Sequence, residues 1–329
     1  MSLVKNIIVK INIFVLLTSF FFSISICHAD ESICSVNENC DPEKEKEDKK
    51  EEDKKEDKKD DKKEEEPPKI GNFALPASQQ PGPLVSFGEN IIDQNQTVLV
   101  LFADDFIGHR KHTIDLIPGV LYGVRDDVSA YFNVPFAASF KDGRDHSAGL
   151  EDVFVQLEYA FYSGKTSKYT DQATVVGSVS VPSGSTKKQP ATGLGSPSFF
   201  LGATFNRTYT DWLFFTSHGV VLTTSTDKTK FGNEFLYQAG LGRNILTIDS
   251  EWIFAWGIEA DGQYTEKSKI KGIVDPDSGG NVVYITPSLF VSSKKFLAQV
   301  GFGLPATQHL FGNQRRNDYL LAANLRWTF

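Results

Sequence analysis

The segment Asp152-Val-Phe-Val-Gln-Leu-Glu-Tyr-Ala-Phe161 alternates between two kinds of side chain over ten residues. One set is apolar and consists of Val153, Val155, Leu157, Tyr159 and Phe161. The other set contains Asp152, Gln156 and Glu158. Successive side chains of a β-strand point to opposite faces. A period of two therefore predicts a strand with one apolar and one polar face.

The same alternation recurs along the chain and gives twelve predicted strands. Most of them have 9 to 14 residues, which is longer than the roughly 5 to 6 residues of an average soluble strand and close to the ~9–11 that cross a membrane barrel. They span about 95–103, 112–124, 127–138, 150–162, 172–182, 196–207, 211–224, 234–246, 251–264, 281–291, 295–304 and 317–329.

The connections between these strands alternate in length. Tight connections are predicted at 124–127, 207–211, 246–251 and 291–295, and long polar ones at 139–149, 183–195, 225–233, 265–280 and 305–316. The connection at 163–171 should be tight in this scheme and is predicted to be longer. Together with the even strand count, this pattern predicts an all-β, transmembrane, antiparallel up-and-down β-barrel over residues 95–329, with both termini periplasmic. A soluble β-sandwich explains the alternation alone, but not the loop lengths or the strand lengths.

The alternation also assigns side chains to the two faces of the wall. Aromatic residues near the strand ends are expected to form interfacial girdles: Tyr122, Phe161, Trp212, Trp252, Tyr264, Tyr319, Trp327 and Phe329. Charged and amide residues on the opposite face are expected to line the lumen: Asp115, Asp152, Gln156, Glu158, Gln238, Glu259, Asp261, Gln263, Asn324 and Arg326. Five acids against one base would favour cations or neutral solutes in an open pore.

The chain before the barrel has three parts. Residues 1–29 resemble an export signal, with an apolar stretch at 11–26 and small residues at Cys27 and Ala29 before the expected cleavage. Residues 30–69 are rich in Lys, Glu and Asp and have no apolar face, which predicts a disordered tether. Residues 70–94 are expected to form a periplasmic lead-in. Cys34 and Cys40 are candidates for a disulfide bond.

The composition excludes several kinds of function. The chain has 329 residues and a net charge of −8, which argues against nucleic acid as a partner. No cluster of Cys and His has the spacing of a metal site, so neither a metal nor another cofactor is expected. Ser217 and His218 are adjacent in a predicted strand and must point to opposite faces, so they cannot form a nucleophile-base pair with each other. We therefore expect no enzyme.

Four short motifs resemble a known family. Tyr122-Gly123-Val124-Arg125-Asp126-Asp127-Val128 is similar to the tyrosine-glycine turn of outer-membrane proteins assigned to the meta-pathway of phenol degradation. Three further segments resemble motifs of the same family: Gly149-Leu150-Glu151-Asp152, Val181-Pro182-Ser183-Gly184 and Gly193-Leu194-Gly195-Ser196. Glu151 stands where this family has a glycine, so the resemblance is to a divergent member. It implies a barrel that moves hydrophobic or aromatic compounds and carries no catalytic residues.

These observations predict a passive channel for small solutes in the outer membrane of a Gram-negative bacterium. The expected partners are outer-membrane lipid, the barrel assembly machinery and small solutes. The alternative is a structural or adhesive barrel with a blocked lumen, whose tether docks to a periplasmic or cell-wall partner. An outer-membrane enzyme that modifies lipids or peptides is a further alternative.

Overall fold

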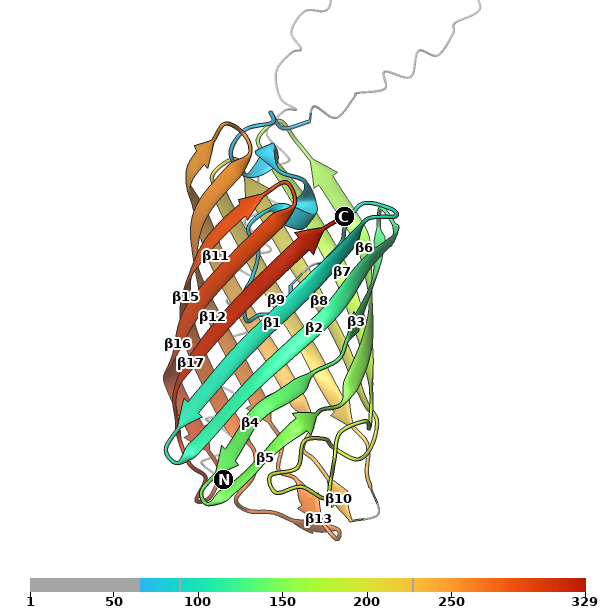
Figure 1. Cartoon of the computed structure of the whole chain (residues 1–329), viewed down its shortest axis with the longest axis vertical. Coiled ribbons are helices and arrows are strands. Elements are labelled where there is room, and N and C mark those ends of the chain that lie inside the picture. The colour runs from blue at the N-terminus through green and yellow to red at the C-terminus, as the bar shows by residue number, and fades with distance from the viewer. Residues whose placement is uncertain (1–65, 89, 227) are drawn as a thin grey trace, which may run out of the picture. The chain divides into compact units, whose positions relative to one another are not determined.

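The protein forms a closed antiparallel barrel of twelve strands. The computed structural model describes residues 66–329, except residues 89 and 227. β1 (Thr97–Gly108) pairs with β17 (Asn317–Thr328) on one side and with β2 (Lys111–Arg125) on the other, which closes the sheet (Figure 1). The predicted fold class is therefore confirmed. The expected signal peptide, the tether before residue 66 and the Cys34–Cys40 disulfide lie outside the described residues.

Two of the twelve wall strands are interrupted. One consists of β3 (Val128–Asn133) and β4 (Phe136–Asp142), which are separated at Pro135, and the other of β5 (Asp145–Leu150) and β6 (Val153–Lys165). The uninterrupted strands that complete the wall are β7 (Tyr169–Val181), β8 (Ser198–Tyr209), β9 (Trp212–Thr223), β11 (Glu234–Ile248), β12 (Trp252–Thr265), β15 (Gly280–Ser293) and β16 (Phe296–Leu310). A small separate sheet contains β10 (Thr229–Lys230), β13 (Lys269–Ile270) and β14 (Ile273–Val274).

Four predicted boundaries are wrong. The strand predicted at 295–304 continues past Pro305 to Leu310, and the other three differ at polar side chains that continue a strand. The first strand continues past residue 103 to Gly108. Residues 139–149 form the β4–β5 hairpin rather than a long loop, and Gly143 takes a positive φ of 67° in its turn. The connection at 163–171 is tight, with three residues between β6 and β7. The backbone hydrogen bonds of a strand depend on its neighbouring strand, so a strand can continue through polar residues.

The connections divide the barrel into two unequal ends. Short turns follow Arg125, Lys165, Tyr209, Ile248 and Ser293 and define the short-turn end, where β1 begins and β17 finishes. The loops at 182–197, 224–233, 266–279 and 311–316 lie at the other end, called here the long-loop end. This confirms the predicted separation of short and long connections.

The outward face of the wall is apolar. Leu157, Leu201 and Leu289 are each more than half exposed on this face. The predicted girdle residues Tyr122, Phe161, Trp212, Trp252, Tyr264, Tyr319, Trp327 and Phe329 also lie on the outward side of the strands or at the chain end, as the alternating burial patterns show. No helix among the described residues is long and apolar enough to cross a membrane.

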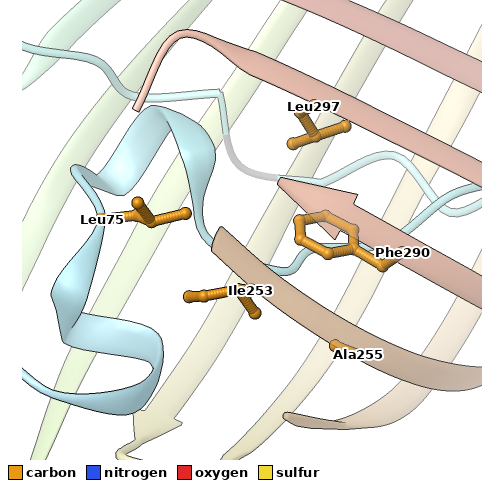
Figure 2. Close-up of a cluster of buried hydrophobic side chains, with 5 residues drawn as sticks. All are labelled: Leu75, Ile253, Ala255, Phe290 and Leu297. Carbon is orange, nitrogen blue, oxygen red and sulfur yellow. The ribbon is translucent and has the colours of Figure 1, made fainter. Parts of the chain in front are cut away.

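Residues 70–88 and 90–93, called here the plug segment, lie inside the barrel before β1. The segment contains the short 3-10 helices η1 (Gly71–Ala74) and η2 (Ala77–Gln79). Leu75 packs into a buried cluster with inward side chains of three wall strands, as Figure 2 shows: Ile253 and Ala255 of β12, Phe290 of β15 and Leu297 of β16. The predicted lead-in at 70–94 therefore occupies the lumen of the barrel rather than a place beside it.

The apolar belt gives a test of the wall's orientation. Leu157 faces outward near the middle of β6, so Leu157→Arg should lower the free energy of unfolding in lipid vesicles by about 2–4 kcal/mol. Denaturant titration followed by tryptophan fluorescence measures this difference. Ser167→Arg, in the exposed turn after β6, is the matched control and should change the free energy by less than about 1 kcal/mol. Equal effects of both changes would contradict a lipid-facing belt.

Candidate functional site

The plug segment is anchored first at the short-turn end. The backbone N–H of Asn72 donates to Thr210 O at 2.7 Å, and its side chain donates to Tyr209 O at 3.0 Å. Gln79 is fully buried and donates to Thr328 Oγ1, while Ser292 donates to Gln79 Oε1 at 3.3 Å. These bonds fix both short helices against strands on different sides of the barrel.

Glu259 holds the next part of the segment by accepting three consecutive backbone N–H groups. Leu84 N donates to Oε1 at 2.5 Å, and Val85 N and Ser86 N donate to Oε2 at 3.1 and 3.0 Å. Glu259 is 2% exposed and lies halfway along β12. Hydrogen bonds to a charged acceptor are about twice as strong as neutral ones, so this carboxylate is the strongest single anchor of the plug segment.

Two further inward side chains extend this anchor. Ser86 Oγ donates to Asp261 Oδ1 at 2.5 Å, and Thr286 donates to the other oxygen of Asp261 at 3.2 Å. The backbone N–H of Phe87 donates to Gln238 Oε1 at 3.1 Å. The segment thus lies along β11 and β12 at mid-height of the wall.

The plug segment then crosses to another part of the wall. Asn90 donates to Glu158 of β6 through its backbone N–H at 2.7 Å and its side-chain amide at 2.8 Å. Gln156 donates to the same carboxylate at 2.6 Å. Arg326 of β17 donates to Asn90 Oδ1 at 3.0 Å. Asn90 therefore links an inward acid and an inward base from two separate strands.

The segment returns to the short-turn end across Gly123. Asn95 N donates to Gly123 O at 2.8 Å, and Gly123 N donates to Gln96 O at 3.0 Å. A Cβ atom at Gly123 would lie 2.0 Å from Asp93 O, so only glycine allows this close approach. The Tyr122-Gly123 turn that carried the family resemblance is therefore a crossing point between wall and plug segment.

Most predicted lumen residues do face inward. The alternating burial patterns of their strands place nine of the ten on this side: Asp115, Gln156, Glu158, Gln238, Glu259, Asp261, Gln263, Asn324 and Arg326. The exception is Asp152, which lies in the break between β5 and β6 and binds a loop.

Asp152 joins the other three family-like motifs into one cluster. Its two oxygens accept the backbone N–H groups of Gly184 at 2.9 Å and Leu194 at 2.7 Å. Ser183 Oγ donates to Glu151 O at 2.7 Å, and Thr192 Oγ1 donates to Leu150 O at 2.9 Å. These side-chain bonds occupy backbone groups at the edge of β5 that no strand pairs. The motifs therefore build the loop that covers a break in the wall.

The sequence alternation did not identify two inward acids, Asp104 and Glu234. Asp104 stands directly opposite Asp115 in the β1–β2 register, and Glu151 is close enough to interact with both. Asp104 was not assigned to a face because the first strand was predicted to end at residue 103. If the alternation of that strand is continued by one residue, Asp104 falls on the inner face. No basic side chain forms an ion pair with Asp104, Asp115 or Glu151 within the described part of the chain.

A cavity of about 580 Å³ remains between the plug segment and the wall. On the wall side it is lined by residues of β1, β2, β3, β6, β7, β8, β9, β15, β16 and β17. These residues include apolar side chains such as Phe102, Ile117 and Phe154 and polar or charged ones such as Lys165, Asp171 and Arg326. Asn90 lines it from the plug segment. The volume lies in the range of sites for small molecules, so this cavity is the candidate functional site.

The histidines do not gather around this cavity. His112 is paired with Asp105 at 2.6 Å, His146 lies 3.4 Å from Ser139, and all four side chains are on the outward face near the long-loop end. Ser217 is buried on the inner face of β9, while His218 faces outward. Within the residues that the structure describes, no group of three or more side chains is arranged to hold a metal ion.

Comparison with known proteins identifies the fold. No family model matches the sequence, and a search of curated proteins finds no match. Among solved structures, an outer membrane channel from Pseudomonas putida F1 is similar, with a TM-score of 0.59 and 12% identity over 72% of this chain and 97% of that chain. The NanC porin has a TM-score of 0.43 and 11% identity over 70% of this chain and 98% of its own. The likeness to the Pseudomonas protein shows a shared barrel fold.

The bonds to Glu259 predict how the plug segment responds to a mutation. Glu259→Gln replaces a charged acceptor of three N–H groups by a neutral amide with one acceptor oxygen. Backbone amides of residues 84–86 should then exchange hydrogen at least about tenfold faster, because the lost bonds are each worth about 1.5–3 kcal/mol. Hydrogen exchange with mass spectrometry measures the rates. Glu251→Gln, at an exposed turn, is the matched control and should leave them unchanged. Equal rates in all three proteins would show that Glu259 does not anchor the segment.

The Asp152 cluster predicts a local change in protease sensitivity. Asp152→Ala removes the acceptor for Gly184 and Leu194, so the loop at 182–197 should become more flexible. Trypsin should then cut more readily after Lys187 and Lys188, which are exposed in this loop. Limited proteolysis of the refolded protein should show cleavage there at least about tenfold faster than in the parent. Asp145→Ala in the exposed β4–β5 turn is the control. Cleavage at the parental rate in Asp152→Ala would mean that other contacts hold the loop.

Proposed function

We propose that the protein is a passive outer-membrane channel for small solutes, narrowed by its own plug segment. The observation that carries this proposal is the combination of an apolar outer belt with a polar inner face that encloses a cavity. An apolar belt with aromatic residues near both ends suits a lipid bilayer. In this proposal the short-turn end, with both barrel termini, is periplasmic and the long-loop end is extracellular.

The family resemblance supports a finer proposal about the solute. The motifs around Tyr122, Asp152, Gly184 and Gly193 resemble those of the phenol meta-pathway family, which implies hydrophobic or aromatic solutes. Aromatic side chains along the cavity are compatible with such solutes. The proposal includes insertion by the barrel assembly machinery and a solute-transport role without a catalytic step.

A second candidate is a structural or adhesive barrel, which the plug segment itself favours. Many buried bonds hold this segment in the lumen, and a barrel that is permanently filled would conduct nothing. In that case the charged tether before residue 66 would serve to dock a periplasmic or cell-wall partner. The two candidates differ in whether ions pass through the barrel.

Conductance in planar bilayers tests the proposal. The refolded parent protein should give small discrete current steps, and Glu259→Gln should increase the step size or the open time because it weakens the anchor of the plug segment. Deletion of residues 70–93 should give the largest steps. Glu251→Gln is the control and should behave as the parent. A deletion variant that folds, as shown by heat-modifiable gel migration, and still conducts no ions would support the structural barrel and refute the channel.

A further inference from the structure

One part of the cavity contains a half-buried arginine and a buried amide in the same row of the wall. The strand registers place Arg326, Val100, Gly119 and Asn133 side by side across β17, β1, β2 and β3. Arg326 and Asn133 both line the cavity. Because they belong to a continuous ladder, their backbone positions are fixed relative to each other.

Arg326 has donors that the protein does not use. A guanidinium has five N–H donors, and the one bond found here joins Nη2 to Asn90 Oδ1. Its Nε is buried and has no partner among the described residues. The neighbouring acid, Glu158, instead accepts N–H groups of Asn90 and Gln156. A buried donor without an acceptor costs about 1–3 kcal/mol, so this position suits an acceptor that comes from outside the chain.

Asn133 supplies a second unused polar group. It has no exposed surface, and neither atom of its amide has a hydrogen-bond partner within the described part of the chain. Asn324, next to Phe102 in the β1–β17 register, also has a buried amide oxygen without a described partner. Buried polar groups in folded proteins are nearly always paired. The wall encloses the amides of Asn133 and Asn324, whereas Arg326 is only half-buried, so Arg326 is the group that a polar ligand in the cavity can reach.

The wall beside these groups carries apolar side chains. The ring of Tyr131 lies over Gly119, where an added Cβ would approach it to 2.8 Å. Tyr131 also packs edge to face with Phe154 at a centroid distance of 6.4 Å. Phe102 and Ile117 stand opposite each other in the β1–β2 register and line the same cavity. This surface can cover a ring or a short hydrocarbon chain.

We propose that this part of the cavity, the Arg326 subsite, binds a small carboxylate with a flat apolar body. The carboxylate accepts hydrogen bonds from Arg326, whose planar fork matches its geometry. The apolar body of the ligand lies against Tyr131 and Phe154, which line the same cavity. This inference deepens the proposed channel function, on which it rests, by naming the class of solute that the lumen retains.

Three matched ligands test the charge and the shape of the solute. Benzoate, benzamide and benzylammonium share a ring but differ in charge, and their binding to the refolded full chain in detergent can be measured by isothermal titration calorimetry. Benzoate should bind at one site per chain, at least about tenfold more tightly than benzamide, and benzylammonium should bind more weakly than either. Equal affinity for benzamide, or tighter binding of benzylammonium, would overturn the proposal.

Variants show whether the carboxylate uses Arg326. Arg326→Gln should weaken benzoate binding at least about tenfold, and Arg326→Lys should weaken it less because the charge remains. Ser217→Ala, on the inner face of β9 away from the cavity, is the matched control and should bind as the parent. Binding of benzoate to folded Arg326→Gln within about twofold of the parent would refute the subsite.

A second variant covers the case in which Arg326→Gln does not fold. Phe154→Ala removes part of the apolar surface of the cavity but leaves the arginine in place, and it should weaken benzoate binding severalfold while heat-modifiable migration stays normal. Unchanged affinity in this variant would count against the subsite. Calorimetry does not depend on ion flow, so the two proposals can fail separately. Benzoate binding without conductance would refute the channel and support the subsite. Conductance without benzoate binding would support the channel and refute the subsite.

Discussion

The structure depends on the closure of its sheet. A strand at the edge of an open sheet has unpaired backbone N–H and C=O groups. Exposing these groups to hydrocarbon costs free energy, and in water they promote aggregation. β1 avoids this by pairing with β2 and β17 along most of its length. Among the described wall strands, β5 has an edge that no other strand pairs. Thr192 donates a hydrogen bond to the carbonyl group of Leu150, the last residue of β5, and Ser183 donates one to the carbonyl group of Glu151, which follows it. The loop at 182–197 thus supplies hydrogen-bond donors to backbone carbonyl groups that have no strand partner.

Closure with twelve strands creates an interior that side chains alone cannot fill. Eight strands leave a lumen just wide enough for side chains, whereas sixteen or more leave an aqueous channel. Here the plug segment occupies the intermediate space, and its backbone N–H groups need acceptors because it forms no sheet with the wall. Glu158 and Glu259 provide those acceptors. Glycine positions such as Gly123 and Gly202 make room for the segment and for its Phe87.

The sequence predicted the wall well because its signals are local. A period of two assigns each residue of a strand to one face, and this was enough to find twelve strands, nine inward polar residues and the outward aromatic residues. The plug segment has no such period. Its hydrogen-bond partners in the wall are 37 to 249 positions away in the chain, as for Ile92 with Ser129 and Gln79 with Thr328. Nothing in residues 70–93 alone indicates that they lie inside a barrel, which is why they were predicted to precede it.

Knowing the face of a charged residue does not reveal its partner. The sequence placed five acids and one base in the lumen and inferred a preference for cations. In the structure, Glu158, Glu259 and Asp261 are hydrogen-bonded to the plug segment, and Asp152 is hydrogen-bonded to a loop. An acid whose oxygens are filled by fixed N–H or O–H groups attracts a passing cation less than a bare carboxylate, because those dipoles already offset its charge. Arg326 is the opposite case, since only one hydrogen bond to it is found among the residues that the structure describes. The preference of this lumen for cations or anions therefore depends on which charged side chains still have free hydrogen-bonding groups. It does not follow from the number of acids and bases alone.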